Sequence, residues 1–226
     1  MSLTKPFSWE YRLRFPILIA SQPLLALFVH WFSGNEGLWY APTFPLATGW
    51  IAAAIGTVGI LLRIHATTYL HVRVMASQEP DASRFVSTGI YGVIRNPLYL
   101  SSLLLFGAYG LFFGALWAGA FVIFHWVRYQ RIIQLEESCL LSSWGQEFED
   151  YCRQVPRWLP RWNGFRPTVR LWISSSGVLA NTLFVTIWAG IVASACTGNL
   201  TWVIPFELAG AIGMAVVHWR SAPLLD

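Results

Sequence analysis

The feature that most constrains this chain is a series of long apolar stretches separated by short polar segments. A membrane-spanning helix needs about twenty mostly apolar residues, and comparable runs occur at 15–32, 45–62, 97–127, 171–196 and 202–219. Only 12% of the 226 residues are charged, about half the fraction of a typical soluble domain. The sequence therefore predicts an all-α integral membrane protein, and we expect its first run to be retained as a span because no small-residue cleavage site follows it.

The run at 97–127 is too long for a single crossing. As one helix it would rise roughly 46 Å, against roughly 30 Å of hydrocarbon. If the chain folds back near Gly107, Gly110 and Gly114, all fifteen Lys and Arg residues fall on one face, as the positive-inside rule expects for the cytoplasmic side. We therefore expect about six membrane segments arranged as three hairpins, with both termini cytoplasmic, in a cytoplasmic membrane or the endoplasmic reticulum.

The polar residues are concentrated in two places, 63–96 and 128–170. Both segments are expected on the cytoplasmic side, where a water-soluble cofactor would enter between the fourth and fifth spans. We predict a single membrane domain, 1–226, whose chemistry lies in a core at 46–165. The remaining hairpin, 166–226, is expected to serve packing or oligomerisation, and the sequence does not predict an oligomeric state.

The charge and cysteine content exclude some classes of function. The net charge is +4, but the cations lie between apolar runs rather than in a basic stripe, which favours a membrane surface over nucleic acid as the partner. Cys139, Cys152 and Cys196 have spacings of neither a zinc site nor a CxxC pair, so we expect small buried apolar residues. No HExxH, P-loop or GxGxxG motif is present, and no metal site is predicted.

The first polar motif, residues 89–99, opens directly into the third apolar run. Its chemistry-bearing positions are Gly89, Tyr91, Arg95, Asn96, Pro97 and Tyr99. Proline suits the first turn of a helix because it has no N–H to leave unpaired. On residue type alone, Arg95 is equally consistent with a side chain that extends to the lipid head groups.

The second polar motif contains Arg131 and the adjacent carboxylates Glu136 and Glu137. We expect it to continue the fourth membrane helix into the cytoplasm. Two acids at a membrane surface are costly without a cation, yet no Arg lies three or four residues from either, so pairing along the helix is excluded. The partner must be another segment or a ligand, and both alternatives remain open.

Five motifs in this order resemble the membrane-embedded methyltransferases typified by isoprenylcysteine carboxyl methyltransferase and its phospholipid-methyltransferase-like relatives. They are Gly89-x-Tyr91, Arg95-x-Pro97-x-Tyr99, the spacing from Arg131 to Glu136-Glu137, Trp144-Gly145-x-x-Phe148-x-x-Tyr151 and Val155-Pro156-x-x-x-Pro160. The resemblance covers roughly residues 46–165. Asn96 stands where that family has a His, which implies an altered contact with the cofactor.

The resemblance implies an S-adenosylmethionine-dependent enzyme that methylates a lipophilic acceptor, such as an isoprenoid-cysteine-like carboxylate or another lipid. It assigns catalysis to Arg131, which would orient an anionic acceptor, and to Glu136. It assigns cofactor binding to Gly89, Tyr91, Arg95, Asn96, Pro97, Tyr99, Glu137 and Tyr151. Two rival interpretations remain: an NADPH-dependent membrane reductase of the sterol-reductase type, and a catalytically inactive membrane scaffold.

Overall fold

The computed structural model describes residues 8–32, 44–70, 80–161 and 181–221. Within them the regular structure is helical, which confirms the all-α class for this part of the chain. The elements are α1 (Ser8–Arg12), α2 (Arg14–Phe32), α3 (Leu46–Thr67), the 3-10 helix η1 (Gly89–Gly92), α5 (Pro97–Leu111), α6 (Ala115–Gln154), α8 (Thr182–Thr197), the 3-10 helix η2 (Leu200–Trp202) and α9 (Val203–Ser221).

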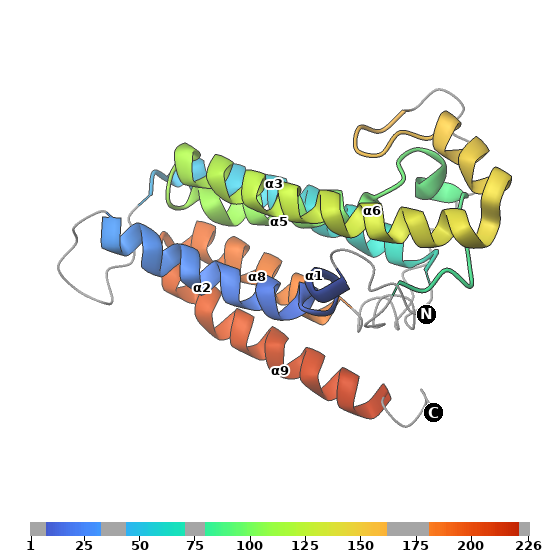
Figure 1. Cartoon of the computed structure of the whole chain (residues 1–226). Helices are drawn as coiled ribbons and strands as arrows, with labels where there is room; N and C mark the ends of the chain where they lie inside the picture. The colour runs from blue at the N-terminus through green and yellow to red at the C-terminus, as the bar shows by residue number, and fades with distance from the viewer. Residues whose placement is uncertain (1–7, 33–43, 71–79, 162–180, 222–226) are drawn as a thin grey trace.

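Each predicted apolar run overlaps helices of the structure, and the run at 97–127 covers two of them, α5 and the first part of α6. In the described residues, α3 is the helix that is both long and apolar enough to cross a membrane, and shorter apolar helices cover 16–32, 97–111, 182–197 and 200–213. The first part of the run at 171–196 lies outside the described residues, and α8 begins at Thr182. The long helices run roughly along one direction (Figure 1).

The chain folds back between α5 and α6, as the length of the apolar run predicts. Gly114 closes the turn with φ 109°, a conformation that strongly favours glycine. A Cβ at Gly110 would lie 2.6 Å from the Cα of Ala118, so the two helices approach each other here at backbone distance. A Cβ at Gly107 would lie 3.2 Å from Val122 of α6. The predicted hairpin is therefore confirmed, and all three suggested glycines lie at its turn or its helix contact.

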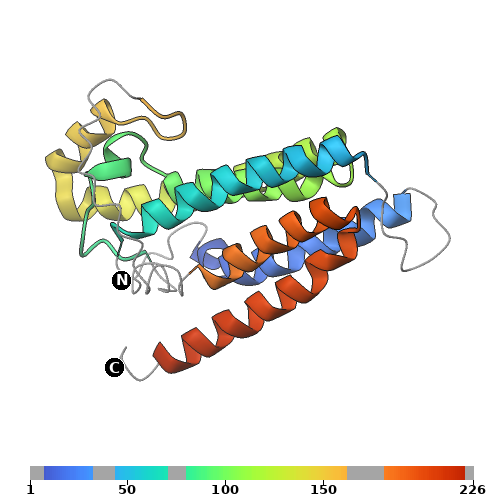
Figure 2. The same cartoon turned by 180° about the vertical axis from the view of Figure 1, so that it is seen from behind.

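The small residues of α3 determine which helices it contacts. A Cβ at Gly56 would touch Trp188 of α8 and Ala108 of α5, and one at Gly59 would lie 3.1 Å from Leu104 of α5. Small residues allow helices to approach closely inside a membrane. As a result α3 packs mainly against α5 and α8, and α8 in turn packs against α9 (Figure 2).

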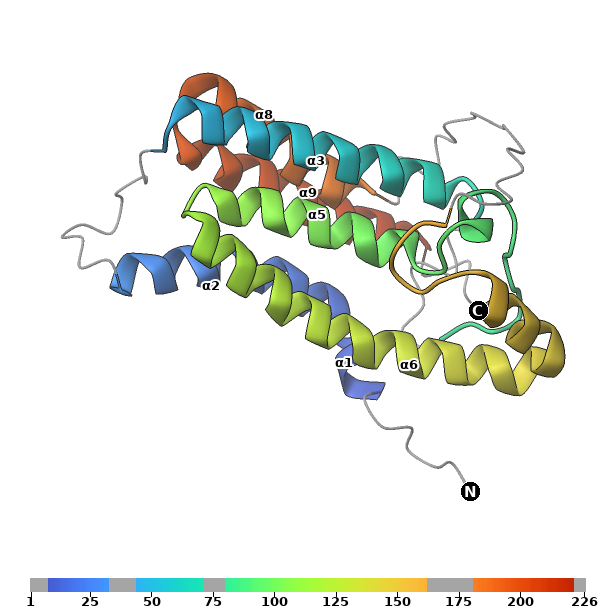
Figure 3. The ribbon, with the colours of Figure 1, turned by 90° about the horizontal axis from the view of Figure 1, so that it is seen from above.

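The first helix pair differs from the predicted arrangement. The α2 helix lies against α5, where the hydroxyl of Tyr109 donates to the carbonyl of Gln22 at 3.2 Å, and against α6, where Phe28 meets the ring of Trp117 at 5.5 Å. The first of the three expected hairpins is therefore not a closely packed helix pair, because the small-residue face of α3 is covered by α5 and α8. The α5–α6 and α8–α9 pairs do pack as hairpins (Figure 3).

A buried arginine links α3 to α5 and α8. Arg63 is only 8% exposed; its Nε donates to the amide oxygen of Asn181 at 2.8 Å, and its Nη1 donates to Ser102 at 3.0 Å and to the carbonyl of Leu98 at 3.2 Å. The guanidinium lies over the ring of Phe184 at 3.3 Å. This network attaches the start of α8 to the core of the bundle.

The α6 helix is 40 residues long and extends beyond the other helices. It bends at Gly145, whose φ of 49° and ψ of −124° interrupt the helical backbone. After the bend, Phe148 and Tyr151 pack against Phe85, and residues 155–161 return toward η1. Residues 80–96 and 144–161 therefore form a polar head at one end of the bundle (Figure 1).

Candidate functional site

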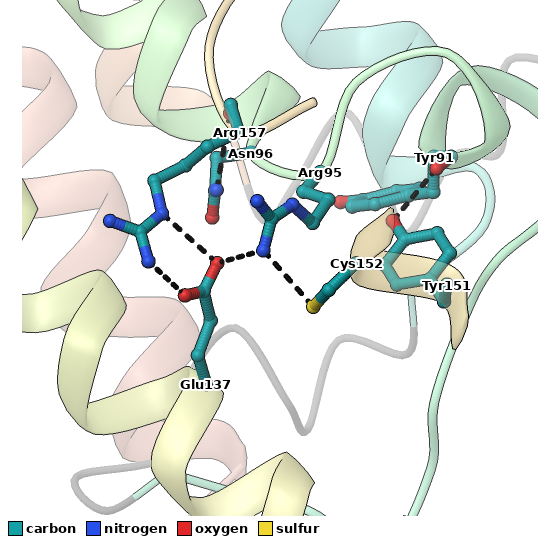
Figure 4. Close-up of polar contacts among 7 residues, drawn as sticks. All are labelled: Tyr91, Arg95, Asn96, Glu137, Tyr151, Cys152 and Arg157. Atoms are coloured by element: carbon teal, nitrogen blue, oxygen red, sulfur yellow. Dashed lines mark hydrogen bonds and ion pairs between the residues drawn. The ribbon is translucent and has the colours of Figure 1, made fainter. Parts of the chain in front are cut away.

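Glu137 is the centre of the polar cluster where α6 enters the head. Arg95 donates from Nη1 to Oε1 of Glu137 at 2.9 Å. Arg157 donates from Nε to the same oxygen at 3.2 Å and from Nη2 to Oε2. One carboxylate thus meets two guanidinium groups from other segments (Figure 4), which supplies the cationic partner that α6 itself lacks.

Backbone contacts place the two arginines. The amide of Arg95 donates to the carbonyl of Pro156 at 2.9 Å, and the amide of Arg161 donates to the carbonyl of Val93 at 3.0 Å. Asn96, at the start of α5, donates from its side chain to the carbonyl of Arg157 at 3.2 Å. The asparagine that replaces the family's histidine therefore holds the Arg157 segment against the first motif.

Tyr91 and Tyr151 connect η1 to the end of α6. The hydroxyl of Tyr151 donates to the carbonyl of Tyr91 at 2.7 Å. The hydroxyl of Tyr91 is buried and has no partner among the described residues, and the same is true of Nε of Arg95. Burial raises the pKa of Tyr91 well above its ordinary value, so this hydroxyl stays protonated and can donate to a ligand.

A cavity of about 380 Å³ opens beside the cluster. Its lining is Arg95, Glu137, Ser138, Leu141, Phe148, Glu149, Cys152 and Arg153. The volume falls within the usual range of small-molecule sites. Arg95 Nη1 also donates to the sulfur of Cys152 at 3.0 Å, so the same guanidinium contacts both the carboxylate and the thiol at the cavity wall.

The donor set of the cavity fits S-adenosylmethionine. Its carboxylates suit the cationic sulfonium and ammonium groups, its arginines suit a carboxylate, and Phe148 offers an aromatic face. The unpartnered hydroxyl of Tyr91 and Nε of Arg95 are further donors beside the cluster. The residues present could therefore hold this cofactor.

The two residues predicted to be catalytic lie in a neighbouring layer, toward α1 and α2. Glu136 accepts from the hydroxyl of Tyr99 at 2.8 Å and lies 4.0 Å from Arg14. Arg131 pairs with Glu10 of α1 at 2.7 Å, and its side chain is 45% exposed. Successive residues of a helix point roughly 100° apart, so Glu136 and Glu137 contact different side chains. The predicted site residues therefore divide into one group around Glu137 and another around Glu136.

The remaining predicted residues shape the backbone. Gly89 has φ 62°, and a side chain there would collide with the ring of Tyr69. Pro97 occupies the first turn of α5, as predicted. Neither is among the residues that line the cavity.

Sequence reasoning missed Arg157 and the position of Cys152. Arg157 directly follows the Val155-Pro156 motif, and that position was the available signal. Cys139 is buried as expected, but the expectation of burial is wrong for Cys196, which is exposed at the end of α8, and holds only in part for Cys152. A hydrogen bond from Arg95 holds Cys152 at the polar wall of the cavity.

Comparison with known proteins agrees with the geometry. Residues 47–147 match the phospholipid methyltransferase family. The nickel-cobalt-cadmium resistance protein NccN of Alcaligenes xylosoxydans xylosoxydans is 33% identical over 124 residues, which cover 52% of this chain and 55% of that protein. The cobalt-zinc-cadmium resistance protein CzcN of Cupriavidus metallidurans is 27% identical over 144 residues, which cover 63% of this chain and 61% of that protein.

The matched part of the chain thus spans little more than half the length of these relatives. No solved structure matches it. The family match contains α3, η1, α5 and most of α6, and with them Arg95 and Glu137. Together with the apolar helices it indicates an integral membrane protein. Through residues 47–147, the chain is therefore similar to the phospholipid methyltransferase family.

Proposed function

We propose that this protein transfers a methyl group from S-adenosylmethionine to a lipophilic acceptor at the cytoplasmic face of a membrane. The observation that supports this most strongly is the Arg95–Glu137–Arg157 cluster beside a cavity of about 380 Å³. The cluster stands at the end of an apolar bundle, where a soluble charged donor and a lipid can meet. The match of residues 47–147 to the phospholipid methyltransferase family supports the same cofactor.

In this proposal the cavity residues bind and orient the cofactor, which when bound supplies a methyl group on a positively charged sulfur. Glu137 and Glu149 offer carboxylates to its cationic groups, and Arg95 offers a guanidinium to its carboxylate. Methyl transfer needs little acid–base help, so the contribution of the protein is alignment of the reactants and exclusion of water. The polar head closes one side of the cavity through Phe148.

The acceptor side is assigned to the layer around Glu136 and Arg131. Glu136 is held by Tyr99 near the cytoplasmic end of α5, and Arg131 is exposed enough to meet an anionic group. A lipid would enter between the helices from the bilayer. In the proposed topology the apolar helices make six crossings, and α1 and the end of α9 lie on the cytoplasmic side with the polar head.

Calorimetric titration of the purified chain with S-adenosylhomocysteine tests the donor site. We expect binding by the wild type and a loss of about ten-fold or more in affinity for Glu137→Gln, because a charged hydrogen-bonded group is removed. Glu147→Gln is the matched control, since Glu147 is exposed on the same helix. Binding of NADPH alone would favour the reductase, and binding of neither ligand would favour the inactive scaffold.

Incubation of the protein with a labelled methyl donor and a total lipid extract tests the acceptor class. A labelled lipid ester would indicate O-methylation and a labelled amine would indicate N-methylation. We expect Arg131→Ala and Glu136→Gln to abolish the transfer while S-adenosylhomocysteine still binds. Full transfer by both variants would remove these residues from the site.

A second function, tolerance of divalent metals, is favoured by the names of the two relatives. The described residues contain no group of three or more His, Cys, Asp or Glu that could hold a metal. We propose that any tolerance conferred by this chain depends on its methyl transfer. Growth on cobalt and cadmium should then be restored by the wild-type chain and not by Glu137→Gln. Equal growth with both would separate tolerance from methyl transfer.

A further inference from the structure

We propose that His125 and Arg128 of α6 form a binding site for the anionic head group of a membrane lipid, separate from the cavity at Glu137. The two residues lie one turn apart on the helix. Arg128 directly follows the apolar run at 97–127, so it lies at the depth of the head groups. It is about 14 Å from Glu137 along the helix axis, which places the two sites at different levels.

The histidine holds the guanidinium in place. Arg128 donates from Nη1 to Nδ1 of His125 at 3.1 Å, because arginine has no acceptor to offer. His125 is fully buried; its ring stacks on Phe106 at 4.1 Å and meets the edge of Phe121 at 4.7 Å. The aromatic rings fix the imidazole, and the imidazole fixes one end of the guanidinium.

The opposite edge of the guanidinium makes no hydrogen bond within the described part of the chain. Nε and Nη2 of Arg128 are buried and have no hydrogen-bond partner among the described residues, although the residue is only 6% exposed. These two N–H groups form the fork that matches a carboxylate or a phosphate through two parallel hydrogen bonds. Buried donors of a charged group are costly without an acceptor. The unpaired Nε and Nη2 of Arg128 therefore favour an oxyanion as their ligand.

Glu10 is the carboxylate that acts electrostatically on Arg128. Its Oε1 pairs with Arg131 at 2.7 Å, and its buried Oε2 has no hydrogen-bond partner among the described residues, Arg128 included. An anion from outside the chain would meet the unpaired N–H groups of Arg128.

The surroundings favour a lipid over a free phosphate as the source of the anion. The ring of Phe124 lies 5.9 Å from the guanidinium carbon of Arg128. Phe124 is 50% exposed, and Ile123 and Val127 beside it are exposed as well. An acyl chain could lie along these side chains, and a shift of the side chains that cover Nε and Nη2 of Arg128 would bring its phosphate to these buried N–H groups.

Native mass spectrometry of the full chain in mild detergent tests the site. The probes are phosphatidylglycerol, phosphatidylcholine with the same acyl chains, and free glycerol phosphate. We expect phosphatidylglycerol to bind more tightly than phosphatidylcholine, and Arg128→Gln to weaken its binding by about ten-fold or more. Arg84→Gln is the matched control, because it removes one positive charge from an exposed position in the polar head.

Two further variants keep the test decisive. Arg128→Lys retains the charge but not the fork and should also weaken binding, and His125→Phe retains the ring packing but should weaken binding less. Thermal unfolding identifies any variant that fails to fold. Unchanged binding of phosphatidylglycerol by folded Arg128→Gln or Arg128→Lys would overturn the proposal, as would equal binding of the two lipids. Displacement of the lipid by an equal concentration of glycerol phosphate would assign the site to a soluble anion and overturn the lipid assignment.

Discussion

The reactivity of Cys152 can show whether the cavity is occupied, because Cys152 lines its wall. It is half-buried and accepts a hydrogen bond from Arg95, and burial raises the pKa of its thiol. Only the thiolate reacts readily, so slow alkylation is expected. We predict that S-adenosylhomocysteine at 100 Kd slows maleimide labelling of Cys152 by about a further 100-fold, because only the unoccupied protein exposes the thiol.

Cys196 provides the internal reference for this measurement, since it is exposed at the other end of the bundle. Peptide mass spectrometry follows both thiols in one sample. Cys196 should label at the same rate with and without the ligand. Equal protection of both thiols would indicate a global change, and protection of neither would place the ligand elsewhere.

Glu136 should make the stability of the protein depend on pH. Burial raises the pKa of its carboxyl above the ordinary value of 4.5, and the nearby charge of Arg14 lowers it by less. The folded state therefore binds more protons than the unfolded state as the pH rises from 4.5 to the folded pKa, so stability falls across that interval. We predict that Glu136→Gln removes this fall.

Thermal unfolding in detergent, measured at a series of pH values from 4.5 upward, checks this expectation. The difference between Glu136→Gln and the wild type should shift in favour of the variant as the pH rises. Glu147→Gln, at an exposed position of α6, should follow the wild type at every pH. A parallel course for all three proteins would contradict the assigned cause.

Sequence reasoning brought Arg95, Asn96 and Glu137 to one site but could not resolve their contacts. The family motifs place these residues in order, whereas ion pairs depend on how separate segments fold onto one another. Arg157 reaches Glu137 only because residues 155–161 return beside residues 93–96. The pairing of Arg131 with Glu10 likewise depends on the position of α1, which no local pattern encodes.

At the scale of the elements, the contact between α5 and α6 near their turn is sensitive to small changes. A methyl group added at Gly110 would meet the backbone of Ala118 at 2.6 Å, so the helices would have to separate. We predict that Gly110→Ala destabilises the protein by about 1–3 kcal/mol. Gly119→Ala should be neutral or stabilising by up to about 1 kcal/mol, because a Cβ there meets no atom within 4 Å.

Denaturant unfolding of both glycine variants in the same detergent checks the contrast. The two substitutions add the same methyl group to the same hairpin, so a difference between them reports the contact and not the change in helix propensity. Equal stability of the two variants would mean that α5 and α6 are farther apart than the structure shows.

Apolar runs predicted the helices well because length and hydropathy are local properties. The pairing of helices was predicted where a short turn enforces it, as at Gly114, and not where it depends on matching faces. The small residues of α3 lie within its apolar run, and nothing in that run shows which neighbour they contact. The bend of α6 at Gly145 could not be predicted from the local sequence either, because it depends on how the polar head folds back.

At the scale of the whole molecule, charge and apolar surface are separated along the bundle. The polar head lies at one end of the bundle (Figure 1), and the Glu137 cluster joins α6 to its arginines (Figure 4). The turn after α5 and the turn between α8 and α9 lie at the opposite end (Figure 2). This separation would allow a soluble donor and a lipid acceptor to approach one reaction centre from different phases.

The native cysteine at the end of α8 tests the orientation that this separation implies. If the apolar helices make six crossings with the polar head in the cytoplasm, Cys196 lies on the outer face. In a Cys139→Ala, Cys152→Ala background, a membrane-impermeant maleimide should label Cys196 in intact cells. Adding Ser83→Cys and replacing Cys196 by alanine should give a protein that is labelled only after permeabilisation, because Ser83 is exposed in the polar head. Labelling of both positions from the same side would contradict the six-crossing arrangement, because an odd number of crossings must separate the two residues.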